Sequence, residues 1–319
     1  MSGPLTIGAD LGGTKMLVGV LDADREVRYE SRETSRGHSE DELIGLIVRE
    51  VADARKACPD TVAVGLGLPC TIDFEHGIAI AAVNLPFTDV AVREMVQEQV
   101  GLPVFLDNDA NVAVLAEHLY GAAQGARNVV MITVGTGIGG GLVLNGEVYR
   151  GSTGAGAELG HVVLQLDGPA CQGSCPGFGH AETLASGTAL GAEGRKAAEG
   201  SPDSVLGGLL AQGLEIDGKA VTAAAMGGDE AARGVVAEIG RRIGATLSGF
   251  ANIFEPDVMV VGGGVMAAGD LLLEPARREV EARALRPMNR TPVVAAQLGN
   301  DAGMIGAASM ARIEFEQRG

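Results

Sequence analysis

The 319-residue sequence contains no Trp, only 3% aromatic residues, and far fewer basic than acidic side chains. Its 24 Lys and Arg residues are set against 41 Asp and Glu residues, which gives a formal net charge of −17. Nucleic-acid-binding proteins use basic tracks and stacking aromatic rings, so we expect no nucleic-acid partner. The sequence also lacks any run of about 18 apolar residues, and its start lacks the basic and apolar regions of a signal peptide. We therefore expect a cytoplasmic protein with no membrane partner.

Cysteine is also scarce. Four cysteines in a chain of this length make a poor disulfide framework and favour a reducing compartment. The length predicts about two domains at roughly 150 residues each, large enough to bury proper cores.

Glycine, by contrast, is abundant and clustered. The 49 glycines are about 15% of the chain, roughly twice the usual share. Groups at 12–13, 135–141 and 262–264 follow or interrupt the short apolar runs LTIGAD, NVVMITV and VMVV. Such runs predict buried strands that enter tight turns, because glycine adopts positive φ at little cost.

Helical segments alternate with these strands. Apolar spacing predicts helices over 39–57, behind an N-capping Ser39, and over 109–123, 231–254 and 270–285. The alternation predicts an α/β architecture.

A weak internal repeat joins the two first glycine groups. Residues 7–22 and 132–147 both follow the pattern strand, glycine turn, strand, and a shift of 125 residues places Gly12 on Gly137. The repeat suggests two related domains, although two unrelated hairpins with the same turn chemistry would give the same pattern.

The glycine turns could bind phosphate through exposed backbone N–H groups. Thr14 and Thr136 add hydroxyl donors, and Lys15 adds charge. Neither turn has the spacing of a P-loop or of a dinucleotide-binding fingerprint. A phosphate in so acidic a chain would need a metal ion, and Asp10 could orient Mg²⁺, although it could equally be an ordinary turn carboxylate.

Polar residues gather in the middle of the chain. Asp107, Asn108 and Asp109 stand between an apolar strand and a helix, where they could cap the helix or hold a hydroxyl and take its proton. Glu158 and His161 are three residues apart, which makes them neighbours in a helical segment.

Four potential zinc ligands follow within 20 residues. His161, Cys171, Cys175 and His180 form the spacing H-x9-C-x3-C-x4-H. Four nitrogen and sulfur ligands suit a closed tetrahedral zinc site. A disulfide between the two cysteines is the alternative, but it leaves both histidines without a role. The zinc site would hold Glu158, His161 and Glu182 toward one pocket.

Taken together, these motifs resemble the ROK family of bacterial sugar kinases and, within it, the glucokinases. The resemblance covers essentially the whole chain, and the following motifs occur in family order: DLGGTK, GLGLPCTID, AVNLPF, DNDANVAVLAE, GTGIGGG, GAGAELGH, GHAETLASG, VGGGV and AGMIGAA. It implies an actin-like ATPase (ribonuclease H-like) fold with two α/β domains around a cleft. We expect a small domain over 1–118, a large domain with the zinc loop over 119–299, and a C-terminal helix, about 300–319, that packs back on the small domain.

The resemblance also implies the chemistry: transfer of the ATP γ-phosphoryl group to the C6 hydroxyl of an aldohexose, expected to be glucose, with Mg²⁺ and a structural Zn²⁺. Asp109 resembles the catalytic base. The residues that resemble sugar ligands are Asn84, Asn108, Glu158, His161 and Glu182. Those that resemble the phosphate-binding and adenine-side turns are Gly12, Gly13, Thr14, Lys15, Thr136, Gly137, Gly263 and Gly264. The resemblance further implies a homodimer or homotetramer.

Two departures from the family pattern stand out. Two extra residues separate Cys171 from Cys175, and His180 stands where the family has a last cysteine. Cys70 replaces a glycine beside the sugar pocket. Alternative functions are a kinase for mannose, fructose, allose or an N-acetylated hexosamine, a polyphosphate-dependent kinase, and a non-catalytic sugar-sensing regulator. The presence of Asp109, the acidic charge, and the lack of room for a DNA-binding domain before Asp10 argue against the regulator.

Overall fold

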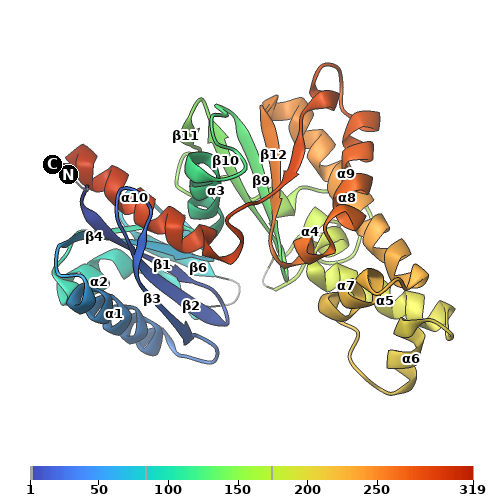
Figure 1. Ribbon diagram of the computed structural model, residues 1–319, viewed down its shortest axis with the longest axis horizontal. Coiled ribbons are helices and arrows are strands. Elements are labelled where there is room, and N and C mark those ends of the chain that lie inside the picture. The colour runs from blue at the N-terminus through green and yellow to red at the C-terminus, as the bar shows by residue number, and fades with distance from the viewer. Residues whose placement is uncertain (1–2, 83–84, 174, 319) are drawn as a thin grey trace.

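The computed structural model describes residues 3–82, 85–173 and 175–318. Within these ranges the chain forms two five-stranded sheets, each covered by helices (Figure 1). The first sheet has the strand order β3-β2-β1-β4-β8 and the second has the order β11-β10-β9-β12-β13. A small antiparallel sheet of β5, β6 and β7 adjoins the first.

The strands of the first sheet are β1 (Leu5–Leu11), β2 (Lys15–Leu21), β3 (Val27–Thr34), β4 (Thr61–Leu68) and β8 (Val104–Asn108). Those of the second are β9 (Val129–Val134), β10 (Ile138–Leu144), β11 (Glu147–Val148), β12 (Val258–Gly262) and β13 (Val293–Ala295). The small sheet contains β5 (Cys70–Asp73), β6 (Ile78–Ala82) and β7 (Thr88–Val90).

The two five-stranded sheets share one topology. In each, the first three strands in chain order are antiparallel neighbours, and the next two extend the sheet in parallel beside the first. The same strand order recurs over five strands, which confirms the predicted pair of related units. The alternative, two unrelated hairpins with the same turn chemistry, would not repeat the other strands. The 125-residue shift is not the structural register, because four residues separate the paired Leu11 and Met16 but only three separate Val134 and Ile138.

Helices fill the connections between strands. They are α1 (Glu40–Ala57), α2 (Val92–Val100), α3 (Asp109–Tyr120), α4 (Ala181–Ala185), α5 (Gly187–Gly200), α6 (Val205–Ala211), α7 (Gly218–Met226), α8 (Glu230–Phe254), α9 (Asp270–Arg283) and α10 (Ala302–Arg318). Short 3₁₀ turns are η1 (Leu159–His161), η2 (Gly264–Ala268), η3 (Met288–Arg290) and η4 (Gly299–Asp301).

The four predicted helices are present. Ser39 caps α1 as expected, through a capping box with Glu42. Two ends were predicted too late: α3 ends at Tyr120 rather than at 123, and α9 ends at Arg283 rather than at 285. Apolar spacing sets the buried face of a helix but marks its end poorly.

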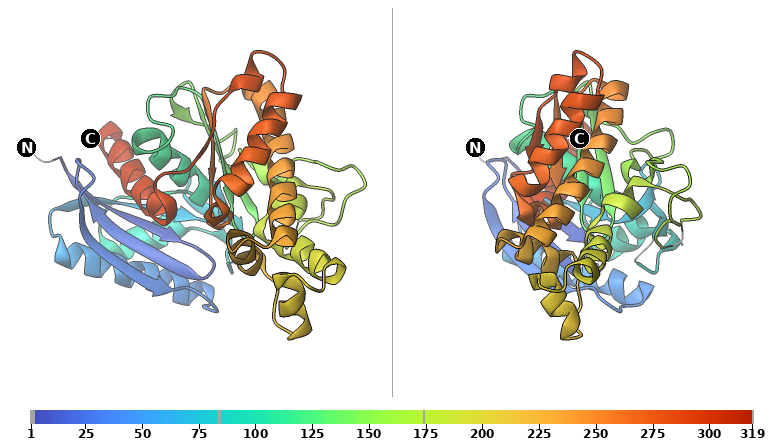
Figure 2. Two further views of the ribbon diagram at one scale, coloured as in Figure 1. Left: turned by 45° about the vertical axis from the view of Figure 1, so that its right-hand side comes forward. Right: turned by 90° about the vertical axis from the view of Figure 1, so that its right-hand side faces the viewer.

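The C-terminal helix α10 returns to the first sheet (Figures 1 and 2). Two strand glycines make this contact possible. A Cβ atom on Gly8 would lie 2.0 Å from the carbonyl oxygen of Met304, and one on Gly65 would lie 1.9 Å from that of Ala307. The backbone of α10 therefore rests directly on β1 and β4.

Helix α3 lies between the two sheets. It packs against α10 on one side, where a Cβ on Gly306 would lie 1.8 Å from the carbonyl oxygen of Val112. On the other side it meets β10, where a Cβ on Gly141 would lie 2.7 Å from the carbonyl oxygen of Ala110. The chain passes from the first sheet to the second through 121–128 and returns through 296–301.

None of the described helices is both long enough and apolar enough to span a bilayer.

Candidate active site

The first glycine turn joins β1 to β2. The backbone N–H of Gly12 donates to the carbonyl of Lys15 at 2.8 Å, and the hydroxyl of Ser35 donates to the carbonyl of Gly12 at 2.6 Å. Gly13 and Thr14 form the rest of the turn, with Thr14 and Lys15 exposed. Backbone bonds and Ser35 therefore brace a turn whose hydroxyl and ammonium groups face solvent.

Asp10 is the second-last residue of β1, beside this turn, and lies against the first turn of α10. A Cβ on Gly303 would lie 2.4 Å from the carboxyl carbon of Asp10, so only glycine leaves room for the carboxylate. Burial, and after it the charge of Asp109, raise the pKa of Asp10 from 3.8 to about 7, against the opposite effect of Lys15. Asp10 and Asp109 are therefore close enough to repel each other.

Asn108 and Asp109 stand where β8 passes into α3. The side-chain oxygen of Asn108 caps the helix by accepting the N–H groups of Ala110 and Asn111, and its amide donates to the carbonyl of Cys70 at 3.1 Å. Burial is the main cause that raises the pKa of Asp109 from 3.8 to about 6; the N–H of Ala110 opposes this shift, and the charge of Glu158 adds to it. The capping alternative thus holds for Asn108, while Asp109 carries a carboxylate that titrates close to neutral pH.

Asp107, which the sequence places beside Asn108 and Asp109 but to which it assigns no separate role, supports this junction. Its buried carboxylate accepts from the N–H of Asn108 and the amide of Asn111, both at 2.8 Å. Arg150, which follows β11, donates to it at 2.7 Å and lies over the ring of Phe74. The triplet at 107–109 was the available signal, but nothing in the sequence pointed to Arg150.

Glu158 and His161 stand on either end of η1. The Nε2 atom of His161 lies 3.9 Å from a carboxylate oxygen of Glu158, so the predicted neighbours do meet. Desolvation raises the pKa of Glu158; His161 lowers it, and Glu182 raises it. We call the carboxylates of Asp10, Asp109, Glu158 and Glu182 the carboxylate row, because the charge of each raises the pKa of the one named before it.

The four predicted zinc ligands form one cluster. One ligand atom from each of His161, Cys171, Cys175 and His180 lies within 4.8 Å of all the others. The two Nδ1 atoms are 3.2 Å apart, and each lies 3.7 Å from a sulfur. Ligands at zinc bond lengths are separated by about 3.3–3.8 Å in a tetrahedron, so the set fits Zn²⁺.

Both sulfurs in this cluster are free thiols, which excludes the alternative of a Cys171–Cys175 disulfide. The Nδ1 atom of His161 faces the cluster, and the Nε2 atom of the same ring faces Glu158. One histidine therefore belongs to both the cluster and the carboxylate row.

The second glycine turn joins β9 to β10, and Glu182 lies beneath it. The Glu182 carboxylate accepts the N–H of Ile138 at 2.8 Å, and a Cβ on Gly137 would lie 2.1 Å from its oxygen. The start of α5 supports the other side of the turn. The N–H of Gly187 donates to the carbonyl of Gly135, and the hydroxyl of Thr188 donates to the carbonyl of Thr136. The row of carboxylates therefore ends at this turn.

A pocket of about 960 Å³ extends from this turn. Its walls come from α5, α7 and η2 and are mostly apolar. They include Thr136 and Gly264 as well as Lys196, Lys219 and Met226. Gly263 lies at φ +88°, where a Cβ would be 2.4 Å from the carbonyl oxygen of Val134. The helical wall residues were not predicted, because no local motif marks them.

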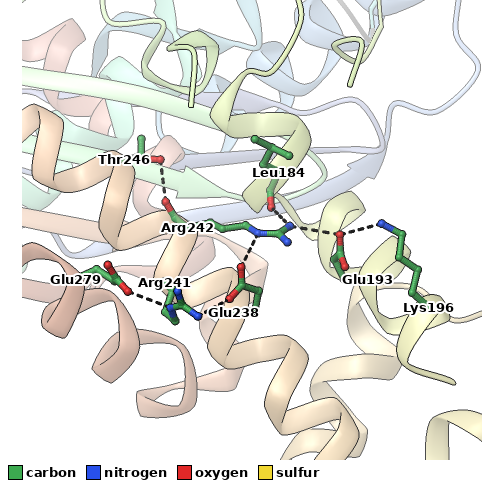
Figure 3. Close-up of polar contacts among 8 residues, drawn as sticks. All are labelled: Leu184, Glu193, Lys196, Glu238, Arg241, Arg242, Thr246 and Glu279. Carbon is green, nitrogen blue, oxygen red and sulfur yellow. Dashed lines mark hydrogen bonds and ion pairs between the residues drawn. The ribbon is translucent and has the colours of Figure 1, made fainter. Parts of the chain in front are cut away.

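Arg242 of α8 ties α4 to α5 behind this site (Figure 3). Its guanidinium donates to the Leu184 carbonyl of α4 at 3.0 Å and reaches Glu193 of α5 at 3.4 Å. Glu238 accepts from its Nε at 3.1 Å. A five-residue helix such as α4, which carries Glu182, is held by contacts of this kind rather than by its own propensity.

Two further predicted residues complete the account. Asn84 lies outside the described residues. Cys70 is buried beside Asn108, and this burial, followed by the charge of Asp109, raises the pKa of its thiol to about 12. A thiol with so high a pKa remains protonated at neutral pH and is a poor nucleophile.

The duplicated sheets and their two glycine turns define a protein of the actin-like ATPase fold. Comparison with known proteins places it more narrowly: the ROK family model matches residues 6–314, and the chain belongs to the ROK family.

Three relatives illustrate the range of similarity. A glucokinase from Streptomyces coelicolor is 36% identical over 316 residues, which is 97% of this chain and 98% of the relative. The crystal structure of a ROK family glucokinase from Streptomyces griseus, in complex with glucose and AMPPNP, is 35% identical with a TM-score of 0.86 and covers 97% of this chain and 99% of that one. The xylose repressor of Bacillus subtilis is 26% identical and covers 94% of this chain but 72% of the repressor.

Proposed function

We propose that the protein is an ATP-dependent hexose kinase that transfers the γ-phosphoryl group of ATP to the C6 hydroxyl of glucose. The observation that carries the proposal is the row of carboxylates between the two glycine turns, in which Asp10 and Asp109 both titrate close to neutral pH. The similarity to glucokinases, one of them crystallised with glucose and AMPPNP, supports the choice of glucose and ATP.

Asp109 acts as the general base in this proposal. A base works best when its pKa lies near the operating pH, and the pKa of Asp109 is raised by burial to about 6. It is therefore ionised at pH 7 and basic enough to accept the proton of the attacking hydroxyl. The Asn108 cap and the Ala110 N–H fix its position at the start of α3.

The sugar hydroxyls pair with polar side chains in place of stacking on aromatic rings, of which the chain has few. We assign this role to Asn84, Asn108, Glu158, His161 and Glu182. A site built to pair hydroxyls discriminates against sugars that lack them, because its own polar groups would remain unpaired.

The phosphates of ATP lie against the backbone N–H groups of the two turns. We assign them to Gly12, Gly13, Thr14 and Lys15 in the first turn and to Thr136 and Gly137 in the second. The adenine side lies at Gly263 and Gly264, next to the apolar pocket of about 960 Å³. In a chain of net charge −17, backbone dipoles supply much of the attraction that lysines provide elsewhere.

Mg²⁺ would be held beside Asp10, because a cation offsets both the burial and the repulsion by Asp109 that raise the pKa of this carboxylate. When bound, Mg²⁺ neutralises charge on the phosphates. Zn²⁺ would be held by His161, Cys171, Cys175 and His180 and would orient His161 toward the sugar.

We further propose that 1–118 together with 300–319 form one lobe and that 119–299 form the other. Closure of the lobes excludes water and limits wasteful hydrolysis of ATP. The protein functions in the cytoplasm as a homodimer or homotetramer and binds neither nucleic acid nor membranes.

The test is a coupled ADP-release assay over a panel of hexoses, with ATP or polyphosphate as donor and with or without Mg²⁺. We expect the highest kcat/KM with glucose and ATP, and none with 6-deoxyglucose, which lacks the accepting hydroxyl. Higher kcat/KM with mannose, fructose, allose or an N-acetylated hexosamine would reassign the substrate. The absence of sugar-dependent ADP release from every hexose would refute the kinase.

A further inference from the structure

Glu117, in the last turn of α3, has a fully buried carboxylate that the chemistry above does not use. Its two oxygens accept three backbone N–H groups. Oε1 accepts those of Gln297 and Leu298 at 2.9 and 2.8 Å, and Oε2 accepts that of Ala122 at 2.8 Å. Three charge-assisted hydrogen bonds offset the cost of burying this carboxylate.

The three amides belong to the two segments through which the chain crosses between the sheets. Ala122 lies in the outgoing segment 121–128, and Gln297 and Leu298 lie at the start of the returning segment 296–301. Gly121 fits against the same carboxylate, since a Cβ there would lie 2.0 Å from Oε2. The side chain of Glu117 thus joins both crossing segments, 121–128 and 296–301, and the glycine at position 121 leaves room for its carboxylate.

Both crossings lead directly to the reactive carboxylates. Asp109 begins α3 and Glu117 lies in the last turn of the same helix, so α3 connects the two. The returning segment leads through η4 into α10, whose Gly303 lies against Asp10. A change of backbone angle at the crossings would therefore move Asp10 and Asp109 relative to the second glycine turn. Hinges in proteins are short segments of this kind at the ends of helices and strands.

We propose that Glu117 is a positioning residue that clasps both crossings into one hinge and so governs the closure of the lobes over their substrates. This proposal rests on the proposed kinase function for its effect on turnover. A carboxylate suits the position because it only accepts hydrogen bonds, and it offers one oxygen to each crossing.

The informative variant is Glu117→Gln, which preserves the volume but replaces one oxygen by an NH₂ group that faces N–H donors. The matched control is Glu50→Gln. Glu50 is also buried, at 5% exposed, but lies in α1 and accepts from Ser31 and Arg49, far from the crossings. Loss of a buried hydrogen bond destabilises both variants, so a lowered melting temperature does not distinguish them.

Three measurements do distinguish them. Amide hydrogen exchange is followed in peptides over 118–124 and 296–300, compaction on adding glucose and AMPPNP is followed by small-angle X-ray scattering, and kcat and KM are measured for glucose. In Glu117→Gln we expect exchange at least tenfold faster at both crossings, reduced compaction, and a tenfold lower kcat with KM within threefold of the unmodified protein. In Glu50→Gln we expect all three to remain unchanged.

Faster exchange at only one crossing would overturn the clasp. The clasp would also be overturned if Glu117→Gln showed the same compaction and the same kcat as the unmodified protein. Identical behaviour of Glu117→Gln and Glu50→Gln would overturn it as well. Failure of the proposed function is separate: it would appear as absent ADP release in the unmodified protein, and the exchange data would still decide whether Glu117 joins the crossings.

Discussion

Replacing Asp10 by Asn should make the protein more stable while it abolishes turnover. The surroundings of this carboxylate disfavour its charge: burial first, and then the charge of Asp109, raise its pKa from 3.8 to about 7, although Lys15 acts in the opposite direction. The amide of Asn has nearly the same shape and no charge to desolvate. The same substitution removes the carboxylate proposed to orient Mg²⁺.

The expected gain follows from the shift in pKa, from 3.8 to about 7. One pKa unit corresponds to about 1.4 kcal/mol, so ionising Asp10 costs the folded state about 4 kcal/mol. The sign follows because the folded protein binds this proton more tightly than the unfolded chain does. The cost is absent below pH 4, grows between pH 4 and 7, and is complete above pH 7. Since Asp109 shares the repulsion, we expect a gain of roughly 2–4 kcal/mol at pH 7.5.

The assay is urea unfolding of the unmodified protein and of Asp10→Asn at pH 4.5, 6.0 and 7.5, without nucleotide or Mg²⁺. The advantage of the variant should grow with each step in pH. Asp22→Asn provides a control of opposite sign. Burial alone would raise the pKa of Asp22, but hydrogen bonds from Arg28 and two backbone N–H groups hold it below its usual value. That variant should be less stable than the unmodified protein at pH 7.5. An Asp10→Asn protein that is no more stable at pH 7.5, or whose advantage does not depend on pH, would refute the reasoning.

Three further predictions concern the reaction. Because the pKa of Asp109 is raised to about 6, kcat/KM should fall tenfold per pH unit below about pH 6. In Asp109→Asn, kcat should fall at least 100-fold, while calorimetry should show that the sugar still binds. Near-normal turnover in this variant would contradict the role of Asp109 as base. Cys175→Ser should lower zinc content, from about one ion per chain by mass spectrometry, and raise KM for glucose through His161; unchanged zinc would exclude the cluster as the site. Arg242→Lys keeps the positive charge but loses the guanidinium that contacts both α4 and α5, so KM for glucose and KM for ATP should both rise several-fold. The control Arg241→Lys lies on the exposed side of α8 and should change neither KM.

Much of the fold could be predicted from the sequence because its signals are local. Short apolar runs that stop at glycine gave the strands β1, β9 and β12, and apolar spacing gave α1 and α8 to within a residue at each end. The internal repeat correctly indicated two related units. Its register could not be found from a fixed shift, since the two turns differ by one residue.

The parts that could not be predicted depend on contacts between distant residues. Arg150 pairs with Asp107 across 43 positions, and Glu117 reaches Gln297 across 180. The pocket walls come from helices whose residues follow ordinary helical spacing, so no motif marks them. Gly8 and Gly65 fit a strand pattern, and only the arrival of α10 explains why each lacks a side chain.

The return of α10 to β1 and β4 also has a consequence for the order in which the protein is made. The first sheet leaves the ribosome before the second, whereas α10, the helix that covers one of its faces, follows every strand of the second sheet. Until α10 emerges, the glycine-lined face around Gly8 and Gly65 has no covering helix, while the second sheet has already been completed by β13. Maturation of the first sheet therefore follows that of the second, in reverse of their order in the sequence, and removal of α10 should harm the first sheet before the second.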